Sequence, residues 1–333
     1  MVSMKDIARR CGVSVATVSK ALNGLPDIGE DTRKRVCAVA EEMGYMTNAA
    51  ARALKTKRTY NLGILVVNER RSGLSHEYFT SITEGFKQEA ESHGYDITFI
   101  NSHVGSEPIS YLRHCRYRSL DGVLVACIDF TDSRVQELVQ SDIPVVTIDH
   151  VFPDRQAILS DNVDGLETLV HYAYNKGHRK IAFLHGEDIA VTRGRLKGFY
   201  KACEELGLEI PEEYVHRCIY HNPDCCEEAT RRLLQLENRP TCIIFPDDYS
   251  FLGGYNAIVE AGLRMPEDVS ALGYDGINLA RLMHLTTYTQ NAMTIGRTSA
   301  QKLIGLIEDP QSVDKAPVTV SGGLLEGTSV KQL

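Results

Sequence analysis

The sequence lacks the apolar segments that membrane insertion or export requires. No apolar run among the 333 residues approaches the 18 or so consecutive residues of a membrane span. The first ten residues, MVSMKDIARR, contain no apolar core of a secretory signal. We therefore expect a cytoplasmic protein with no membrane partner.

Cysteine patterns typical of disulfide frameworks and zinc sites are also missing. The nine cysteines are an odd number, and no two of them form a CxxC pair. Cys225 and Cys226 are adjacent, but no histidine pair at ligand spacing accompanies them. We expect buried or half-buried free thiols and no bound metal.

The signatures of common enzyme classes are absent from the sequence. GEDIAVTRGR does not end in the Gly-Lys-Ser/Thr of a phosphate loop, and GILVVN lacks the GxGxxG that follows a first Rossmann strand. Neither GxSxG nor HExxH occurs. These absences argue against a kinase or isomerase with a regulatory head. They predict a protein that is not an enzyme and has no cofactor.

Length and charge indicate several domains with different partners. A chain of 333 residues is too long for one core, so a small domain and two medium ones are expected. Residues 1–60 hold eleven Lys or Arg against six acidic residues, a net charge of +5, so the other 273 residues carry −13 of the total of −8. A basic head on an acidic body points to a polyanion at one end. A merely solvated basic face would give the same count.

Three short helices are predicted in residues 1–46. Ser3 and Ser14 can cap the first two, and Gly12 suits the left-handed turn that ends the first. The predicted helices cover residues 4–11, 15–23 and 30–43. A short turn between the first two is typical of a helix-turn-helix, whose second helix can lie in the DNA major groove. A helical hairpin that serves packing alone is the alternative.

The second predicted helix offers few hydrogen-bonding groups to DNA bases. Val15 and Ala16 would read thymine methyls or DNA shape, whereas Lys20 could reach guanine O6 and N7. Thr17, Ser19 and the amide end of the helix are better placed for phosphates. The following segment, TNAAARALKTKRTYN, is alanine-rich and basic. A single short helix there is marginal in water, and a plain flexible linker is the alternative.

From residue 61 onward, short apolar runs alternate with amphipathic helical segments. This alternation is typical of parallel sheets covered by helices on both faces. The apolar runs are residues 62–67, 97–101, 122–127, 144–149, 157–160, 180–185, 215–220, 242–245 and 269–274. So many strands exceed one sheet, and we predict an α/β protein with two doubly wound lobes behind a small all-α head.

The segment MKDIARRCGVSVATVSKALNG, residues 4–24, carries a more specific pattern. Its distinctive residues are Asp6, Ile7, Ala8, Gly12, Val13, Ser14, Thr17, Val18, Ser19, Leu22 and Asn23. With them the chain resembles the LacI/GalR family of bacterial transcription regulators. The resemblance continues through NKGHRKIAFLHG, EAGLRMPEDVSALGYDG and LTTYTQ. It implies a core akin to periplasmic sugar-binding proteins, with two lobes that close on a ligand and three crossings of the chain between them.

The resemblance also implies domain boundaries. The head covers 1–46, the hinge 47–60, the N-terminal lobe 61–159 and 290–318, and the C-terminal lobe 160–289 and 319–333. The crossings then fall near Ser160, Gln290 and Val318. The hinge is implied to pair with that of a second copy and to push Leu54 into a minor-groove step. The implied DNA-binding residues are Ser14, Val15, Ala16, Thr17, Ser19, Lys20, Asn23, Asn48, Ala51, Leu54 and Lys55.

A ligand site is expected outside the carboxyl ends of the strands, where ligands of such folds lie. By resemblance, Arg193 and Asp275 match ligand-contacting positions of the family. The full expected set is Tyr78, Phe79, Asp149, Asp161, Arg193, Asp247, Asp275 and Gln290. Each of these residues could instead have a purely structural role. The arginine could form an interlobe ion pair, and the aromatic pair could pack in the core. Three of the aspartates could cap loops or form turns, and the glutamine could be structural.

The function implied by this resemblance is ligand-controlled DNA binding. Aromatic faces beside carboxylates and one guanidinium suit a neutral sugar. We expect a repressor of carbohydrate-utilisation genes that binds a pseudo-palindromic operator as a dimer and is released by the sugar, with a corepressor of opposite sign as the alternative. No heptad repeat follows the core, which favours a dimer. An exported solute-binding protein is disfavoured by the basic head.

Overall fold

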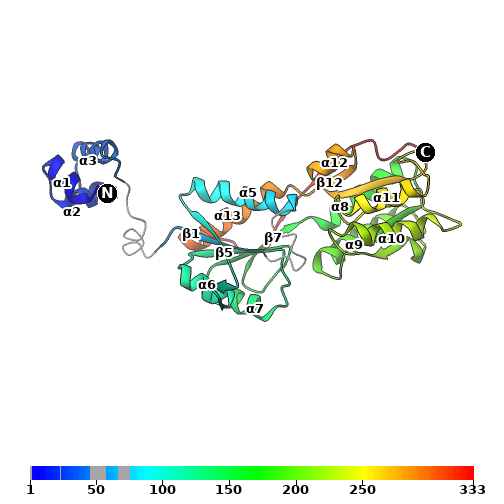
Figure 1. Cartoon of the computed structure of the whole chain (residues 1–333), viewed down its shortest axis with the longest axis horizontal. Coiled ribbons are helices and arrows are strands. Elements are labelled where there is room, and N and C mark those ends of the chain that lie inside the picture. Colours follow the sequence, from blue (N-terminus) through cyan, green and yellow to red (C-terminus); the bar gives the residue numbers. More distant parts are fainter. Residues whose placement is uncertain (1, 23, 46–57, 67–75) are drawn as a thin grey trace. The chain divides into compact units, whose positions relative to one another are not determined.

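The computed structural model describes residues 2–22, 24–45, 58–66 and 76–333. The chain forms two compact units, Met1–Thr59 and Tyr60–Leu333 (Figure 1). Within these ranges, no helix has both the length and the apolar character needed to cross a membrane.

Three helices build the first unit. They are α1 (Met4–Cys11), α2 (Val15–Leu22) and α3 (Glu30–Glu42). Ser3 caps α1 through a reciprocal pair, in which its backbone N–H donates to the Asp6 carboxylate at 3.0 Å and its hydroxyl accepts from the Asp6 N–H at 3.4 Å. Gly12 ends α1 with φ = 63°, in the left-handed region. The predicted three-helix head is confirmed.

The apolar faces of these helices meet in one small core. Its buried members are Ile7, Ala8, Cys11, Val18, Ala21, Val36 and Ala40. Each helix contributes residues three or four positions apart, as expected for one buried helical face. Because the core is small, the opposite face of α2 stays in solvent.

The second unit begins with a parallel six-stranded sheet. Its strands are β1 (Asn61–Val66), β2 (Asp96–Phe99), β5 (Gly122–Ala126), β6 (Val145–Ile148), β7 (Gln156–Ser160) and β13 (Val318–Val320). They pair in the order β13-β7-β6-β5-β1-β2. The covering helices are α5 (Glu77–Ser92), α6 (Tyr111–Arg118), α7 (Ser133–Val139) and α13 (Ala292–Glu308). Figure 1 shows α5 and α13 on one face of the sheet and α6 and α7 on the other.

A second six-stranded sheet forms the other lobe. Its strands are β8 (Ile181–His185), β9 (Val215–Arg217), β10 (Cys242–Ile244), β11 (Ser270–Asp275), β12 (Thr286–Thr289) and β14 (Gly323–Leu325). They pair in the order β14-β12-β11-β10-β8-β9, and only β14 runs antiparallel to its neighbour. The helices of this lobe are α8 (Asn162–Asn175), α9 (Ala190–Glu205), α10 (Pro223–Leu234), α11 (Phe251–Glu260) and α12 (Asn278–Leu282).

The chain passes between the two sheets three times. The first passage follows Ser160 at the end of β7, and the second lies between Thr289 and Ala292. The third lies at Ser321–Gly322, later than the boundary expected after Val318, because Val318–Val320 pairs with β7 as part of the first sheet. A strand this short has no periodicity that would reveal it in the sequence.

Some smaller elements were not expected from the sequence. They are α12, β12, β14 and the hairpin of β3 (His103–Val104) with β4 (Glu107–Pro108). All nine cysteines are free thiols, and eight of them are buried or half-buried as expected. Cys37 is the exception, since it lies exposed on α3.

Helices α5 and α13 approach so closely that one glycine of each faces backbone atoms of the other. A Cβ at Gly296 would lie 2.0 Å from the carbonyl oxygen of Ile82, and one at Gly85 would lie 2.2 Å from that of Met293. These separations are far below any van der Waals contact, so neither position accepts a larger residue without moving a helix. This contact between α5 and α13 thus fixes the position of α13, which begins directly after the second passage.

We predict that Gly296→Ala lowers the free energy of unfolding by about 2–3 kcal/mol, because the added methyl would overlap backbone atoms that cannot rotate away. Gly323→Ala is the matched control, since no atom lies within 4 Å of the Cβ it would add. Urea titration followed by circular dichroism measures both. Equal midpoints for the two variants would contradict this account of the helix contact.

Candidate functional site

The outer face of α2 is a small exposed surface in the head. Ser14 caps the helix by accepting the backbone N–H of Thr17 at 3.0 Å. Val15 is 41% exposed, Ala16 is exposed, and Ser19 is half-buried. The start of the helix therefore presents small apolar groups and backbone amides to solvent. The other expected DNA-binding residues lie outside the described part of the chain: Asn23, Asn48, Ala51, Leu54 and Lys55.

Lys20 lies exposed on the same helix and pairs with Asp27. Both side chains are about half exposed, so the pair contributes little to stability and can exchange partners readily. A phosphate or a guanine edge would compete with Asp27 for this ammonium group.

A pocket of about 210 Å³ lies between the two lobes of the second unit. It is lined by the start of α5, by the end of β11, and by the second passage of the chain. The lining residues are Glu77, Tyr78, Ser81, Asp275, Gly276, Ile277, Thr289, Asn291, Ala292, Met293 and Thr294. Tyr78 and Asp275, which the sequence placed in a common site, are thus brought together.

Several residues at the carboxyl ends of strands have left-handed backbone. Asp149 follows β6 with φ = 55°, Asp275 ends β11 with φ = 110°, and His221 follows β9 with φ = 55°. Positive φ is uncommon outside glycine and occurs often at functional sites. At each position the backbone turns sharply, so the side chain stays at the end of the sheet.

Asp149, Ser160 and Tyr78 are joined by hydrogen bonds. The Asp149 carboxylate accepts the Ser160 N–H at 2.7 Å and its hydroxyl at 3.1 Å, and the Tyr78 hydroxyl lies 3.2 Å from that hydroxyl. Burial raises the pKa of Asp149, and it also raises that of Tyr78. Tyr78, on α5, lines the interlobe pocket, whereas Asp149, after β6, is not among its lining residues.

Asp275 and Gln290 form a buried pair at the second passage. The Gln290 Nε2 group donates to Asp275 Oδ1 at 2.5 Å. Burial raises the pKa of Asp275 to about 7 despite the neighbouring Arg195. Asp248 lies behind this pair and accepts Gly276 N–H, Ile277 N–H and the Thr287 hydroxyl, so it holds the loop after β11.

Asp247 organises the segment that carries His221. Its carboxylate accepts the backbone N–H of His221 at 2.9 Å and both the N–H and hydroxyl of Ser250 at 2.7 Å. Burial alone would raise the pKa of Asp247, but the hydrogen bond and charge of His221 lower it to about 2. Asp247 therefore holds His221 in position through its backbone N–H and its ring.

His76 and His221 were not expected from the sequence. His76 precedes α5 in the first lobe, and its ring centroid lies 3.7 Å from that of His221 in the second lobe. Burial, followed by the neighbouring His221, lowers the pKa of His76 to about 4. Phe79 is half-buried beside both rings. No motif spacing in the sequence links positions 145 residues apart.

Arg193, which the sequence analysis expected at the ligand site, is not among the residues that line the interlobe pocket, and the buried arginine of the same helix is Arg195. The guanidinium of Arg193 is exposed and pairs with Asp188 at 2.7 Å. Arg195 is 4% exposed, donates to Asn162 Oδ1 at 2.9 Å and to the Pro246 carbonyl at 2.7 Å, and stacks on Tyr274. Two residues along a helix turn by about 200°, so the two arginines point to opposite faces of α9.

Asp161 has a structural position. Its carboxylate accepts the Asp164 N–H at 3.2 Å and so caps α8 at the first passage. It is not among the residues that line the interlobe pocket. These contacts agree with the alternative that Asp161 is a turn or capping residue.

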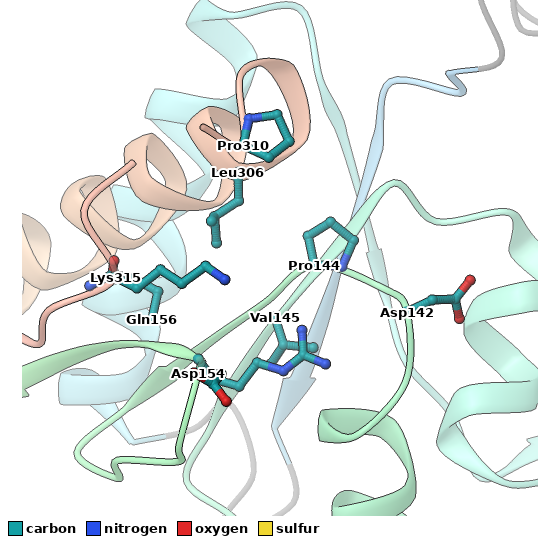
Figure 2. A pocket seen from close by; sticks show the side chains of 9 residues that line it. Asp142, Pro144, Val145, Asp154, Gln156, Leu306, Pro310 and Lys315 are labelled. Carbon is teal, nitrogen blue, oxygen red and sulfur yellow. The ribbon is translucent and has the colours of Figure 1, made fainter. Parts of the chain in front are cut away.

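A second pocket of about 250 Å³ lies at the opposite, amino end of the first sheet (Figure 2). Figure 2 shows Leu306 and Lys315 beside Gln156 and Val145, at the starts of β7 and β6. Arg155 also lines this pocket, and its guanidinium donates to two backbone carbonyls. Because ligands of doubly wound sheets lie beyond the carboxyl ends of strands, the interlobe pocket is the better candidate.

A two-lobed core with a ligand pocket between its sheets, preceded by a helix-turn-helix, defines a ligand-binding DNA regulator. Residues 60–321 match the family described as periplasmic binding proteins and sugar binding domain of LacI family. Residues 3–48 match that described as bacterial regulatory proteins, lacI family. The chain belongs to the LacI family, as the sequence predicted.

Individual relatives agree with this family over the full chain. The HTH-type transcriptional repressor PurR of Yersinia pestis (strain Pestoides F) is 31% identical over 334 residues, which cover 96% of each chain. The lac repressor dimer bound to operator and the anti-inducer ONPF has a TM-score of 0.77 at 23% identity over 99% of each chain. The transcriptional regulator CelR–cellobiose complex has a TM-score of 0.72 at 23% identity, over 99% of this chain and 100% of that one.

We predict that Arg195→Ala lowers the free energy of unfolding by about 2–4 kcal/mol, because it leaves the Asn162 and Pro246 acceptors buried without a donor. Arg193→Ala is the matched control on the same helix, and it should change stability by less than about 0.5 kcal/mol. Chemical denaturation of the purified variants measures both values. A larger loss for the Arg193 variant would reverse the assignment.

Proposed function

We propose that this chain is a transcriptional repressor of carbohydrate-utilisation genes. It binds a pseudo-palindromic operator as a homodimer, and a small neutral sugar in the interlobe pocket alters its affinity for DNA. The observation that carries this proposal is the pocket itself, which is lined by both lobes and by the passage between them. A ligand there contacts both lobes and the second passage between them.

The chemistry around the pocket favours a sugar. Tyr78 lines the pocket with Phe79 packed against its ring, and the carboxylate of Asp275 can accept hydroxyl groups. The guanidinium of Arg195 is held by two neutral acceptors and an aromatic ring, so the structure does not dedicate it to a ligand phosphate. Two structural neighbours were solved with cellobiose and with ribose bound, which supports the same class.

The passages supply a route from ligand to DNA. Ser160 contacts Tyr78 at the first passage, Gln290 contacts Asp275 at the second, and Asn291 donates to the Ser321 carbonyl at 2.6 Å, joining the second to the third. A ligand that changes the lobe separation acts on all three. Coupling is reciprocal, so operator must change the affinity for the sugar by the same factor by which the sugar changes the affinity for operator. The coupling free energy is typically about 1–3 kcal/mol.

DNA recognition is assigned to the exposed face of α2 and to the hinge. Val15 and Ala16 offer apolar groups for thymine methyls, and Lys20 offers a donor for guanine. Leu54 is assigned the minor-groove wedge, with Asn48, Ala51 and Lys55 beside it, on the basis of the sequence resemblance. Two heads bind one operator together, which explains why each chain needs only one small head.

Effector identity is tested by thermal shift of the full chain against neutral sugars, phosphosugars and purines, with and without operator DNA. A neutral sugar should raise the melting temperature, and operator should change the apparent affinity for it by about 5–150-fold, because the two bind linked states. A response only to a purine or a phosphosugar would reject the sugar assignment. A sugar affinity that operator leaves unchanged would reject the coupling.

Lys20→Ala should weaken operator binding by about tenfold or more, because it removes both a charge and a base-edge donor. Lys34→Ala on α3 is the matched control with the same loss of charge from an exposed site. Fluorescence anisotropy on operator and on random DNA separates the two effects. If both variants lose the same affinity on both DNAs, Lys20 serves only as a positive charge.

A further inference from the structure

Three possible metal ligands converge at the interlobe pocket. His76, His221 and Asp275 each place one ligand atom within 4.8 Å of the others. His76 comes from the first lobe, immediately before α5, whereas His221 follows β9 and Asp275 ends β11 in the second lobe. The cluster therefore spans the two lobes and borders the pocket through Asp275.

His76 has two ring nitrogens that the described part of the protein leaves without hydrogen bonds. His76 is 6% exposed, and neither of its ring nitrogens hydrogen-bonds to any described residue. The Nδ1 atom of His221 is buried and faces Asp247 Oδ1 at 3.5 Å, so this nitrogen already has a carboxylate neighbour in the protein. A buried unsatisfied polar group costs about 1–3 kcal/mol, so such groups usually have a partner. A ligand between the lobes would supply it.

Neighbouring groups orient two of the three ligands. Asp247 faces Nδ1 of His221 and also holds its backbone, which leaves Nε2 directed to another partner. Gln290 donates to Oδ1 of Asp275, which leaves Oδ2 available. A carboxylate behind a histidine and a donor behind a carboxylate are the supports that metal ligands commonly have.

The charges around the cluster favour a cation. Four aspartates lie at these strand ends and in the loops after them: Asp149, Asp247, Asp248 and Asp275. Arg195 is the nearby basic side chain of α9, and its Nε and NH1 groups donate to neutral acceptors. A bound divalent ion would offset the excess of carboxylates at this edge of the two sheets.

We propose that His76, His221 and Asp275 bind a divalent transition metal ion, with zinc as the ion to test, and that this ion joins the two lobes. Two imidazole nitrogens and one carboxylate form the donor set of three-ligand zinc sites, in which a fourth position stays open. Tetrahedral bonds of about 2.1 Å place ligand atoms roughly 3.4 Å apart, so small side-chain rotations complete the site. The adjacent pocket provides the open position for water.

The cleft would then bind a second ligand, the metal ion, besides the proposed sugar. Since the ligands come from both lobes, the ion binds the arrangement in which the lobes meet more tightly than any arrangement in which they separate. This goes beyond sugar-controlled repression and does not require a sugar. Zinc binding alone should therefore raise the melting temperature of the full chain in the absence of sugar and DNA.

The test is zinc titration of the chelator-stripped full chain in competition with a chromophoric chelator, without sugar or DNA. One zinc ion should bind per chain, and His76→Ala and His221→Ala should each weaken binding by at least about 100-fold, beyond the effect of an outer-shell partner. His93→Ala, at an exposed position on the same lobe as His76, is the matched control and should bind zinc as the parent does.

His76→Phe separates metal binding from a packing role. It should abolish high-affinity zinc binding yet leave the melting temperature of the metal-free chain equal or higher, because it removes unpaired buried nitrogens at similar volume. Cobalt binding should show d–d absorption without the charge-transfer band of a thiolate. The proposal fails if these variants bind zinc like the parent, if no zinc binds, or if the cobalt spectrum shows thiolate ligation. A failed sugar screen would leave all of these results standing.

Discussion

The burial of carboxylates at the ends of parallel strands is the constraint on which the core depends. A carboxylate in such a place must accept hydrogen bonds, because its desolvation is otherwise too costly. Asp248 takes them from the loop after β11, and Asp149 takes them from Ser160 at the first passage. Asp275 takes one from Gln290 at the second. The groups that satisfy Asp149 and Asp275 therefore lie at passages between the two lobes, whereas those that satisfy Asp248 lie within the second lobe.

In the proposed function, this arrangement links ligand binding to lobe movement. The pocket borders Asp275 and the segment from Thr289 to Thr294, and that segment leads directly into α13. Helix α13 packs on α5 through glycines that face backbone atoms of the other helix, so α13 cannot shift without α5. In the proposed function, a ligand that displaces the passage therefore moves α13 and α5 together. Packed elements of this kind can have two discrete arrangements, as allosteric control requires.

The candidate site shows how far sequence reasoning reaches. Resemblance pointed to α9 and to Asp275, but on α9 it selected Arg193, which is exposed, whereas the buried arginine of that helix is Arg195. A helix turns about 100° per residue, so an error of two positions changes the face completely. His76 and His221 could not be paired from sequence, because no local spacing relates residues on separate lobes. Their contact exists only after both sheets have formed.

The sequence by itself determined the three helices of the head, the alternation of strands and helices, and the family, since these depend on local periodicity, caps and short motifs. Tertiary structure alone decided which strand ends meet, where the third passage lies, and which side chains share the pocket. Val318–Val320 is β-branched but too short to show a period, and the sequence does not tell that it pairs with β7. Contacts between distant segments depend on packing, and packing is a property of the whole chain.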